Sequence, residues 1–254
     1  MISKRIAPCL ILNDEKLIHR KSFDYKTDRY IGDPINAVNI FNDYTVDEMF
    51  IIDITASAVK RQINFDLLKD IAGEAFFPLA YGGGIKTAND AEKIISIGYE
   101  KIIINSEIIK NPNILKEINK LIGAQSIIVS IDIFIRESKY YIYDYIQKKI
   151  VNLNLKDFLN LIQKIGIGEL LLTVVNLDGT MKGSNIEIIK SLSKDINIPL
   201  IYKGGAASID DIKKVMNTEA NVFASSTLFI MKKLNGGIVF NYPSENEKRE
   251  YGIL

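Results

Sequence analysis

The sequence predicts an α/β protein, a (β/α)8 TIM barrel with a two-fold half-barrel repeat, as a single domain over residues 1–254. Three observations predict this class. The chain has 254 residues, which is the usual size of such a barrel. Short apolar runs alternate with amphipathic segments, the pattern of a parallel sheet covered by helices. Residues 78–106 also resemble residues 199–227 at one constant offset (199 − 78 = 121), without a gap.

The repeated unit has the same layout in both copies. An apolar strand, a glycine turn, a helix with a capping box and a second strand follow one another in each. Identical residues coincide at Pro78 and Pro199, Leu79 and Leu200, Tyr81 and Tyr202, Gly83 and Gly204, Gly84 and Gly205, and Asp90 and Asp211. This duplication favours two half-barrels that close on each other. An open doubly wound sheet is the alternative, but its dinucleotide-binding glycine pattern does not follow the first strand.

Each copy also predicts a phosphate-binding site, so two such sites are expected on one face of the barrel, and each is termed a half-site after its half-barrel. Glycine lets the backbone approach an anion closely, and hydroxyl or amide residues at the end of the next strand can donate to it. The first half-site would comprise Gly83, Gly84, Asn105 and Ser106, and the second Gly204, Gly205, Ser226 and Thr227. The alternative is that both turns need glycine for backbone reasons alone.

The remaining elements follow from apolar runs and the residues at their boundaries. In the first half of the chain we expect strand one at residues 6–12, a polar loop at 13–34, a helix from Pro34, strand two closing at Asp53, and strands three and four in the first repeat. A helix at about 111–123 then leads to strand five around Asp132 and a hairpin insertion at 137–153. Strand six at 169–175, a helix from Asn185, and strands seven and eight in the second repeat complete the chain. A loop as long as 13–34 should be a functional lid or disordered. The tail from residue 236 shows no clear helical period, and we expect a short final element there with a loose end.

Composition narrows the classes of function. The chain has 32 Lys and Arg against 31 Asp and Glu, a net charge of +1, so charge gives no reason to expect a nucleic-acid partner. With 1 Cys and 1 His, we expect no metal site, and no cofactor is indicated. No apolar run is long enough for a membrane span, and the first one is too short for a signal peptide. We therefore expect a soluble cytoplasmic protein with no membrane partner.

The strand ends carry polar residues, as expected for the catalytic face of a barrel. They include Asp53, Asn105, Asp132, Asn176 and Asp178. The repeat offset gives a position opposite Asp132, since 132 − 121 = 11, and that position is Ile11. A symmetric site would offer two carboxylates for acid and base work. This sequence predicts one carboxylate that faces an aliphatic side chain.

Charged residues also stand just before four of the apolar strands. They are Arg5, Glu48, Lys101 and Glu169, on strands one, two, four and six. Two positive and two negative side chains could close into a ring at the bottom of the barrel. One interpretation is a set of salt bridges that seals the end of the core.

Short motifs in order along nearly the whole chain carry a resemblance to a known family. They are RIAPCL, GDPINA, DITAS, YGGGI, KIIINS, SIDI, LLTVVNLDGT and KGGA. The chain resembles the cyclase subunit of imidazole glycerol phosphate synthase (HisF-like). That resemblance implies a (β/α)8 barrel whose phosphorylated small-molecule ligand carries two phosphates. It also implies that ammonia arrives from a glutaminase subunit docked on the barrel bottom and travels through the barrel's centre.

The resemblance also assigns roles by motif position. Its phosphate motifs match Gly83, Gly84, Asn105 and Ser106 for one phosphate, and Asp178, Gly179, Gly205, Ser226 and Thr227 for the other. Its ammonia gate matches Arg5, Glu48, Lys101 and Glu169. Of its two catalytic aspartates, Asp132 matches the second and Ile11 replaces the first. His19 stands where the family has a lysine, and Asn176 where it has an aspartate.

These departures lead to two main hypotheses. Because an alkyl group cannot transfer a proton, Ile11 argues against cyclase chemistry. The CLIL, GDPINA and NYPS segments look more like a paralogous group that serves, with a glutaminase and an ATP-dependent amidotransferase, in placing acetamidino groups on surface-glycan sugars. The first hypothesis is thus an ammonia-handling subunit with little cyclase activity. The alternative is a true cyclase, a lyase of histidine biosynthesis. A phosphate-binding barrel without a partner is disfavoured by the four-residue gate.

Overall fold

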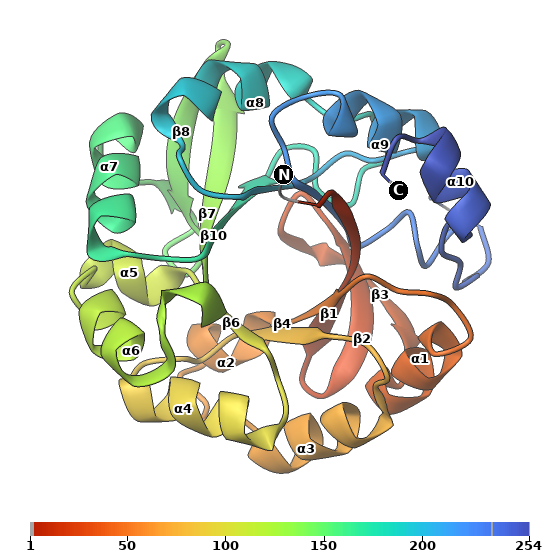
Figure 1. Cartoon of the computed structure of the whole chain (residues 1–254), viewed down its shortest axis with the longest axis horizontal. Coiled ribbons are helices and arrows are strands. Elements are labelled where there is room, and N and C mark those ends of the chain that lie inside the picture. The colour runs from red at the N-terminus through yellow and green to blue at the C-terminus, as the bar shows by residue number, and fades with distance from the viewer. Residues whose placement is uncertain (1–2, 235, 254) are drawn as a thin grey trace.

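The computed structural model describes residues 3–234 and 236–253. In this part of the chain, eight parallel strands form a closed barrel with helices around it (Figure 1). The barrel strands are β1 (Arg5–Asn13), β4 (Met49–Asp53), β5 (Leu79–Gly82), β6 (Lys101–Ile104), β7 (Ile127–Arg136), β10 (Glu169–Val174), β11 (Leu200–Lys203) and β12 (Val222–Ser225). Neighbours pair in this order, β12 pairs with β1, and β7 pairs with β10 to complete the ring. The predicted (β/α)8 barrel is confirmed.

Helices follow the strands and cover the outside of the barrel (Figure 1). They are α1 (Pro34–Phe41), α2 (Ile54–Ala58), α3 (Phe65–Glu74), α4 (Ala88–Ile97), α5 (Ser106–Lys110), α6 (Ile114–Ile122), α7 (Leu155–Ile165), α8 (Ile186–Leu192), α9 (Ile209–Met216) and α10 (Glu245–Glu250), with 3-10 turns at Ala124–Ser126 and Ser193–Asp195. Polar caps fix their starts. Asp33 accepts from the Asn36 N–H ahead of the Pro34 turn, and Asn185 accepts from the Ile188 N–H.

The two halves repeat in backbone conformation as well as in sequence. Gly83 and Gly204 both have φ of 130°, and Gly84 and Gly205 have φ of 70° and 84°. These values favour glycine over any other residue. A Cβ at Gly83 would lie 2.3 Å from the Asp53 carbonyl oxygen, so the turn has no space for a side chain. The backbone therefore explains these glycines by itself, and phosphate binding needs independent support.

The barrel interior is apolar between its two ends. Its inward side chains include Ala7, Phe50, Ala80, Ile128, Leu171, Ile201, Val222 and Ala224, which belong to one buried cluster. A second and larger cluster fills the space between the strands and the helices. The interior is thus an apolar column that joins a charged layer at the strand starts to a cavity at the strand ends.

Residues 13–34 form a β-hairpin, so the prediction of an irregular loop was wrong. β2 (Lys16–Lys21) pairs antiparallel with the end of β1 and with β3 (Asp24–Gly32). Leu17 joins the outer hydrophobic cluster and Ile18 joins the inner one. Alternate side chains of β2 therefore pack on opposite faces, which fixes the register of the hairpin. Most residues of the segment are polar, and this made the short alternation of buried positions in β2 hard to recognise in the sequence.

The hairpin predicted at residues 137–153 is confirmed. β8 (Lys139–Asp144) pairs antiparallel with the end of β7, and β9 (Lys149–Ile150) pairs with β8. The tail holds α10 as its short final element, although its sequence shows no helical period. Ser244 and Glu247 form a capping box there, and buried Lys248 contacts the Asp47 carboxylate at 2.7 Å. A helix of 6 residues is too short to show a period in its sequence.

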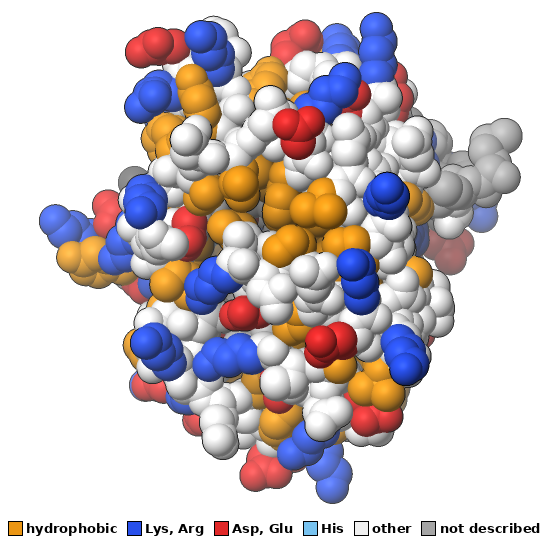
Figure 2. Space-filling view, turned by 90° about the vertical axis from the view of Figure 1, so that its left-hand side faces the viewer, with side chains coloured by type: hydrophobic (Ala, Val, Ile, Leu, Met, Phe, Trp, Pro, Cys, Tyr) orange, Lys and Arg blue, Asp and Glu red, His pale blue; other side chains and the backbone are white. Residues whose placement is uncertain are grey.

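Figure 2 shows the side of the barrel that carries α6 and α7. Positive and negative side chains are interspersed across it, with hydrophobic side chains between them. Leu121 of α6 and Leu161 of α7 are each 43% exposed. The mixture of charges agrees with the net charge of +1. Within the described ranges, no helix has both the length and the apolar character that a membrane crossing requires.

Candidate functional site

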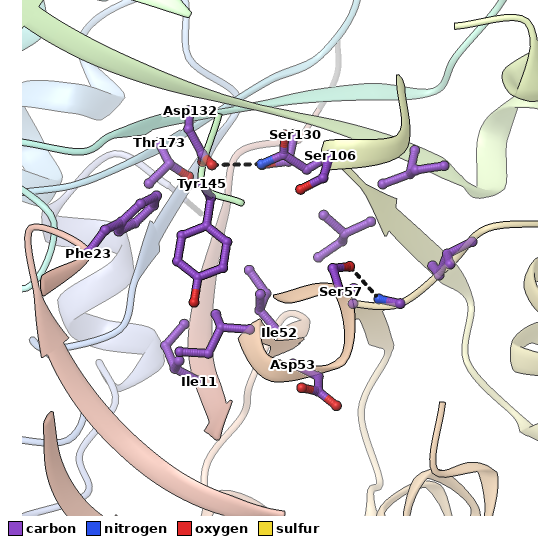
Figure 3. Close-up of a pocket in the computed structure, with 18 of the residues that line it drawn as sticks. Ile11, Phe23, Ile52, Asp53, Ser57, Ser106, Ser130, Asp132, Tyr145 and Thr173 are labelled. Carbon is purple, nitrogen blue, oxygen red and sulfur yellow. Dashed lines mark hydrogen bonds between the residues drawn. The ribbon is translucent and has the colours of Figure 1, made fainter. Parts of the chain in front are cut away.

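A cavity of about 110 Å³ lies at the carboxyl ends of the barrel strands, where barrels of this class carry their chemistry (Figure 3). Most of its surface is apolar, and a few polar groups converge on it. The lining includes Ile11, Phe23, Ser57, Gly83, Gly84, Asn105, Ser106, Asp132, Tyr145, Asp178 and Lys203. Nowhere in residues 3–234 and 236–253 do three or more His, Cys, Asp or Glu side chains gather in a way that could hold a metal ion.

Asp132 is a buried carboxyl of this cavity, whose lining acids also include Asp53, Glu107 and Asp178. It is 5% exposed, and one of its oxygens accepts a hydrogen bond from Nδ2 of Asn105 at 2.8 Å (Figure 3). Burial raises the pKa of Asp132 to about 7, although the Asn105 hydrogen bond and the Lys203 ammonium group act in the opposite direction. A carboxyl that titrates near neutral pH can both accept and donate a proton there.

Ile11 lines the same cavity from β1 and is 8% exposed. The repeat offset predicted that it would be the counterpart of Asp132, and the structure brings the two side chains to one cavity (Figure 3). Ile52 of β4 extends the apolar wall beside Ile11. At positions 11 and 132 the chain therefore has one alkyl group and one carboxyl group, where a symmetric barrel would have two carboxyl groups.

The first predicted phosphate half-site opens onto the cavity. Gly83, Gly84, Asn105 and Ser106 all line it. The Gly84 N–H donates to the hydroxyl of Ser57 at 3.0 Å, which is one of the dashed contacts of Figure 3. Ser57 was not among the predicted phosphate residues. An anion at this turn would meet the hydroxyls of Ser57 and Ser106 as well as backbone N–H groups.

The second predicted half-site is less accessible. Its members are Asp178, Gly179, Gly204, Gly205, Ser226 and Thr227, and of these Asp178 lines the cavity. The β2–β3 hairpin lies across it. The Ser22 N–H donates to the Asp178 carbonyl oxygen at 2.8 Å, and Nε2 of His19 lies 3.0 Å from the Gly179 carbonyl oxygen. Burial lowers the pKa of His19, so its neutral ring donates to that carbonyl. The two half-sites share a backbone shape and differ in access.

Lys203 is a cavity residue that the sequence analysis missed. Its side chain is buried, and Nζ lies 2.7 Å from the Asp178 carboxylate. The repeat counterpart of Lys203 is Gly82 (203 − 121 = 82), and that of Asp178 is Ser57 (178 − 121 = 57). The second half-barrel therefore has an ion pair where the first has neutral residues. The available signal was a lysine at the end of an apolar strand, in the KGGA motif.

Two hairpins meet at the outer wall of the cavity. Phe23, in the turn between β2 and β3, packs edge-on against Tyr145, with ring centroids 5.6 Å apart. Arg20 of β2 donates to the Tyr145 hydroxyl at 2.9 Å and forms an ion pair with Asp28 at 2.6 Å. Since Arg20, Phe23 and Tyr145 all line the cavity, these contacts narrow its mouth. The amino-acid pattern gave no indication that the two insertions would touch.

The four charged residues at the strand starts form a closed ring at the opposite end of the barrel. Arg5 contacts Glu48 at 2.9 Å and Glu169 at 2.6 Å, and Lys101 contacts the same two glutamates at 3.0 Å each. Burial raises the pKa of Glu48, against the opposite effect of Arg5 and Lys101. Each glutamate uses a single oxygen for both cations. The other oxygens, Oε1 of Glu48 and Oε2 of Glu169, are buried with no hydrogen-bond partner among the described residues.

This ring is a costly way to close a barrel. Removing charges from water can outweigh their mutual attraction, and each unsatisfied buried oxygen adds a further cost of about 1–3 kcal/mol. Apolar side chains would seal the same end without that cost. The structure thus brings the four predicted gate residues together in one ion-paired ring at the base of the apolar interior.

Comparisons with known proteins agree with this architecture. The family model described as "Histidine biosynthesis protein" matches residues 5–234. A Vibrio vulnificus protein, provisionally named imidazole glycerol phosphate synthase subunit hisF3, is 35% identical over 253 residues, covering 98% of this chain and 96% of the relative. A Pseudomonas aeruginosa protein, provisionally named subunit hisF2 of the same enzyme, is 33% identical over 251 residues, covering 97% and 98%. Imidazole glycerol phosphate synthase subunit HisF of Petrotoga mobilis is 34% identical over 231 residues, covering 90% and 91%.

Proposed function

The chain belongs to the histidine biosynthesis protein family, and from that premise we propose that it is the HisF-like barrel subunit of a glutamine-dependent complex. In this proposal a glutaminase subunit docks at the strand starts and supplies ammonia. The barrel passes the ammonia to an ATP-dependent amidotransferase that forms acetamidino sugars of surface glycans. A phosphorylated small molecule binds in the upper cavity. The alternative is that the chain is the cyclase subunit of imidazole glycerol phosphate synthase, the enzyme in the relatives' names.

The closed ring of Arg5, Glu48, Lys101 and Glu169 carries the ammonia-handling part of the proposal. It stands at the base of an apolar interior whose other end is the cavity. Neutral ammonia can cross an apolar column, whereas ammonium would lose its hydration there. On the same face as the ring, just ahead of β5, Phe76 is 86% exposed, and a docked partner would cover it.

The departures from the cyclase pattern are built into this chain. Ile11 packs in the inner hydrophobic cluster. Asn176 holds the end of β7 with both sides of its amide, since Oδ1 accepts from the Ile135 N–H at 2.7 Å and Nδ2 donates to the Ile135 carbonyl at 3.2 Å. An ionised aspartate could not donate the second bond. These contacts support a barrel that has exchanged cyclase groups for structural ones, and so favour the first hypothesis over the alternative.

The test of the ammonia path uses the barrel together with its glutaminase and amidotransferase. Product formation from glutamine is compared with product formation from ammonium salts. Lys101→Met removes a ring cation while keeping much of its volume, and it should change the glutamine-driven rate several-fold relative to the ammonium-driven rate. Binding of the glutaminase should stay within about twofold. Lys190→Met, on the exposed face of α8, is the matched control and should change neither rate.

Equal effects of Lys101→Met on both nitrogen sources, together with a matching fall in melting temperature, would return the ring to a purely stabilising role. The alternative function has its own assay. With the cyclase substrate and ammonium salts, we expect turnover on the order of 10²–10⁴ below that of a cyclase with two aspartates. Comparable turnover would establish the alternative. The neighbouring reading frames also discriminate, since a glutaminase beside an ATP-pyrophosphatase-type amidotransferase supports the first hypothesis and a histidine operon supports the second.

A further inference from the structure

The upper cavity carries an acid and a cation that an ammonia path does not require. Asp132 and Lys203 both line it, and both come from the second half-barrel. At the corresponding positions the first half-barrel has Ile11 and Gly82. Asp132 and Lys203 therefore come from one half-barrel and share the cavity with Ile11 and Ile52 of the other half. The first half also contributes charged lining residues, Arg20 and Asp53, which form ion pairs with Asp28 and Arg61.

Lys203 is a fixed cation in this cavity. Burial by itself would lower the pKa of Lys203, but the Asp178 carboxylate 2.7 Å away raises it above its usual value. The amine therefore keeps its proton at neutral pH and cannot act as a nucleophile. An ammonium group has three N–H donors, so donors beyond the one directed at Asp178 can reach an oxygen of a ligand.

The ion pair of Lys203 and Asp178 is not needed to fill the end of the barrel. The first half-barrel has the neutral residues Gly82 and Ser57 at the same positions, and its own ion pair, Asp53 with Arg61 at 2.7 Å, stands at different positions. A buried ion pair seldom stabilises a fold more than neutral residues of similar shape. Charged groups held at that cost in a cavity wall are a feature of ligand recognition.

We propose that the upper cavity transfers a proton at a carbon next to the carbonyl group of a small phosphate monoester. The phosphate lies against the turn at residues 83–84, and the carbonyl oxygen accepts a hydrogen bond from Lys203. The Asp132 carboxylate takes the proton, the C–H electron pair becomes the double bond of an enolate, and the carbonyl π pair moves to oxygen, where the ammonium group stabilises the charge. Return of the proton to carbon regenerates the carboxylate, so atoms and electrons balance without another reactant. This inference rests on the phosphorylated ligand of the proposed function and is independent of the ammonia path.

The test follows deuterium incorporation into dihydroxyacetone phosphate by ¹H NMR, with the full chain in D₂O near neutral pH. Signals of the carbons next to the carbonyl should decline faster than in buffer, and inorganic phosphate should slow the exchange by competing for the turn. Asp132→Asn should lower the rate on the order of 10²-fold or more. Lys203→Met should lower it by about 10²-fold, because it removes the group that stabilises the enolate oxygen. Lys190→Met should match the unmodified chain.

An Asp132→Asn preparation purified in the same way also reveals any contaminating isomerase. Equal exchange in both proteins, or none above buffer, would overturn the proposal. Because Lys203→Met leaves Asp178 without its cation, the double variant Asp178→Ser/Lys203→Gly provides a neutral test that copies the first half-barrel. Undiminished exchange in that variant would remove Lys203 from the reaction. Phosphate binding seen by ³¹P NMR without exchange would reject the proton transfer and leave the phosphorylated ligand of the proposed function intact.

Discussion

Replacing Asp132 with asparagine should make the stability of the barrel less sensitive to pH. Burial raises the pKa of this carboxyl from 3.8 to about 7 in the folded chain. Between those values the folded protein holds a proton that the unfolded chain releases, so the free energy of unfolding falls as the pH rises towards 7. At about 1.4 kcal/mol per unit, the loss between pH 5 and pH 8 is about 3 kcal/mol. Because asparagine does not titrate, the free energy of unfolding of Asp132→Asn should not fall for this reason.

The measurement is urea unfolding of both proteins at pH 5, 6, 7 and 8. The quantity to compare is the difference between their free energies of unfolding, which should shift in favour of Asp132→Asn by about 3 kcal/mol across the range. The other groups that act on this carboxyl are Asn105, Asp144, Asp178 and Lys203, and its neighbours Tyr143 and Tyr145 feel it in turn. All are present in both proteins, so their own titration largely cancels. A difference that stays constant from pH 5 to pH 8 would mean that Asp132 is ionised throughout, and the cavity would then lack an acid that works near neutral pH.

Three further outcomes test the ring, the turns and the phosphate half-site. Lys101→Met should lower the free energy of unfolding by about 3 kcal/mol in chemical denaturation, because both ring glutamates are then left with one arginine. Adding Glu169→Gln should recover part of this loss. Full stability of the single variant would contradict the argument that the ring charges are buried away from water. Gly83→Ala should lower the free energy of unfolding by at least about 2 kcal/mol, because its Cβ would lie 2.3 Å from a carbonyl oxygen. Gly32→Ala, whose Cβ would have nothing within 4 Å, should change that free energy by no more than about 0.5 kcal/mol. Equal changes in the two variants would refute the steric argument. Ser57→Asp places a carboxylate beside the first turn and should weaken phosphate binding at least tenfold in a ³¹P NMR titration; unchanged affinity would show that the anion binds elsewhere.

The repeat made most of the barrel predictable. Strand, turn and capped helix are local features, and finding them twice at one offset indicated how the two halves relate. Gly83 and Gly204 were predicted as turn residues because their role depends on backbone conformation, which a glycine at the end of an apolar strand reports directly. The four members of the ring were predictable for a similar reason, since residues at the starts of parallel strands must meet at one end of a closed barrel.

The features that prediction missed depend on contacts between distant segments. Nothing in the polar segment around Phe23 indicates that its ring would pack on Tyr145, because that contact needs two insertions to lean over the same cavity. Lys203 was missed because its role depends on its ion pair with Asp178, a buried residue in the loop that follows the preceding barrel strand. A useful signal was present at both positions of that pair. Lys203 and Asp178 are charged, whereas their repeat counterparts in the first half-barrel, Gly82 and Ser57, are neutral. In a duplicated barrel, positions that differ in charge between the two copies are therefore candidate site residues.

The two ends of the barrel draw on its halves in different ways. Glu48 and Glu169 are repeat counterparts (48 + 121 = 169), bridge the same two cations, and each leave one oxygen without a partner in the described part of the chain. Arg5 and Lys101 both come from the first half, whereas Asp132 of the upper cavity comes from the second. Closing a barrel end requires no charge, and this supports the proposed role of the ring in the passage of a small polar molecule. If that passage is its role, admission of ammonia at one end does not depend on cyclisation at the other, because the side chains for each stand at opposite ends of the same eight strands.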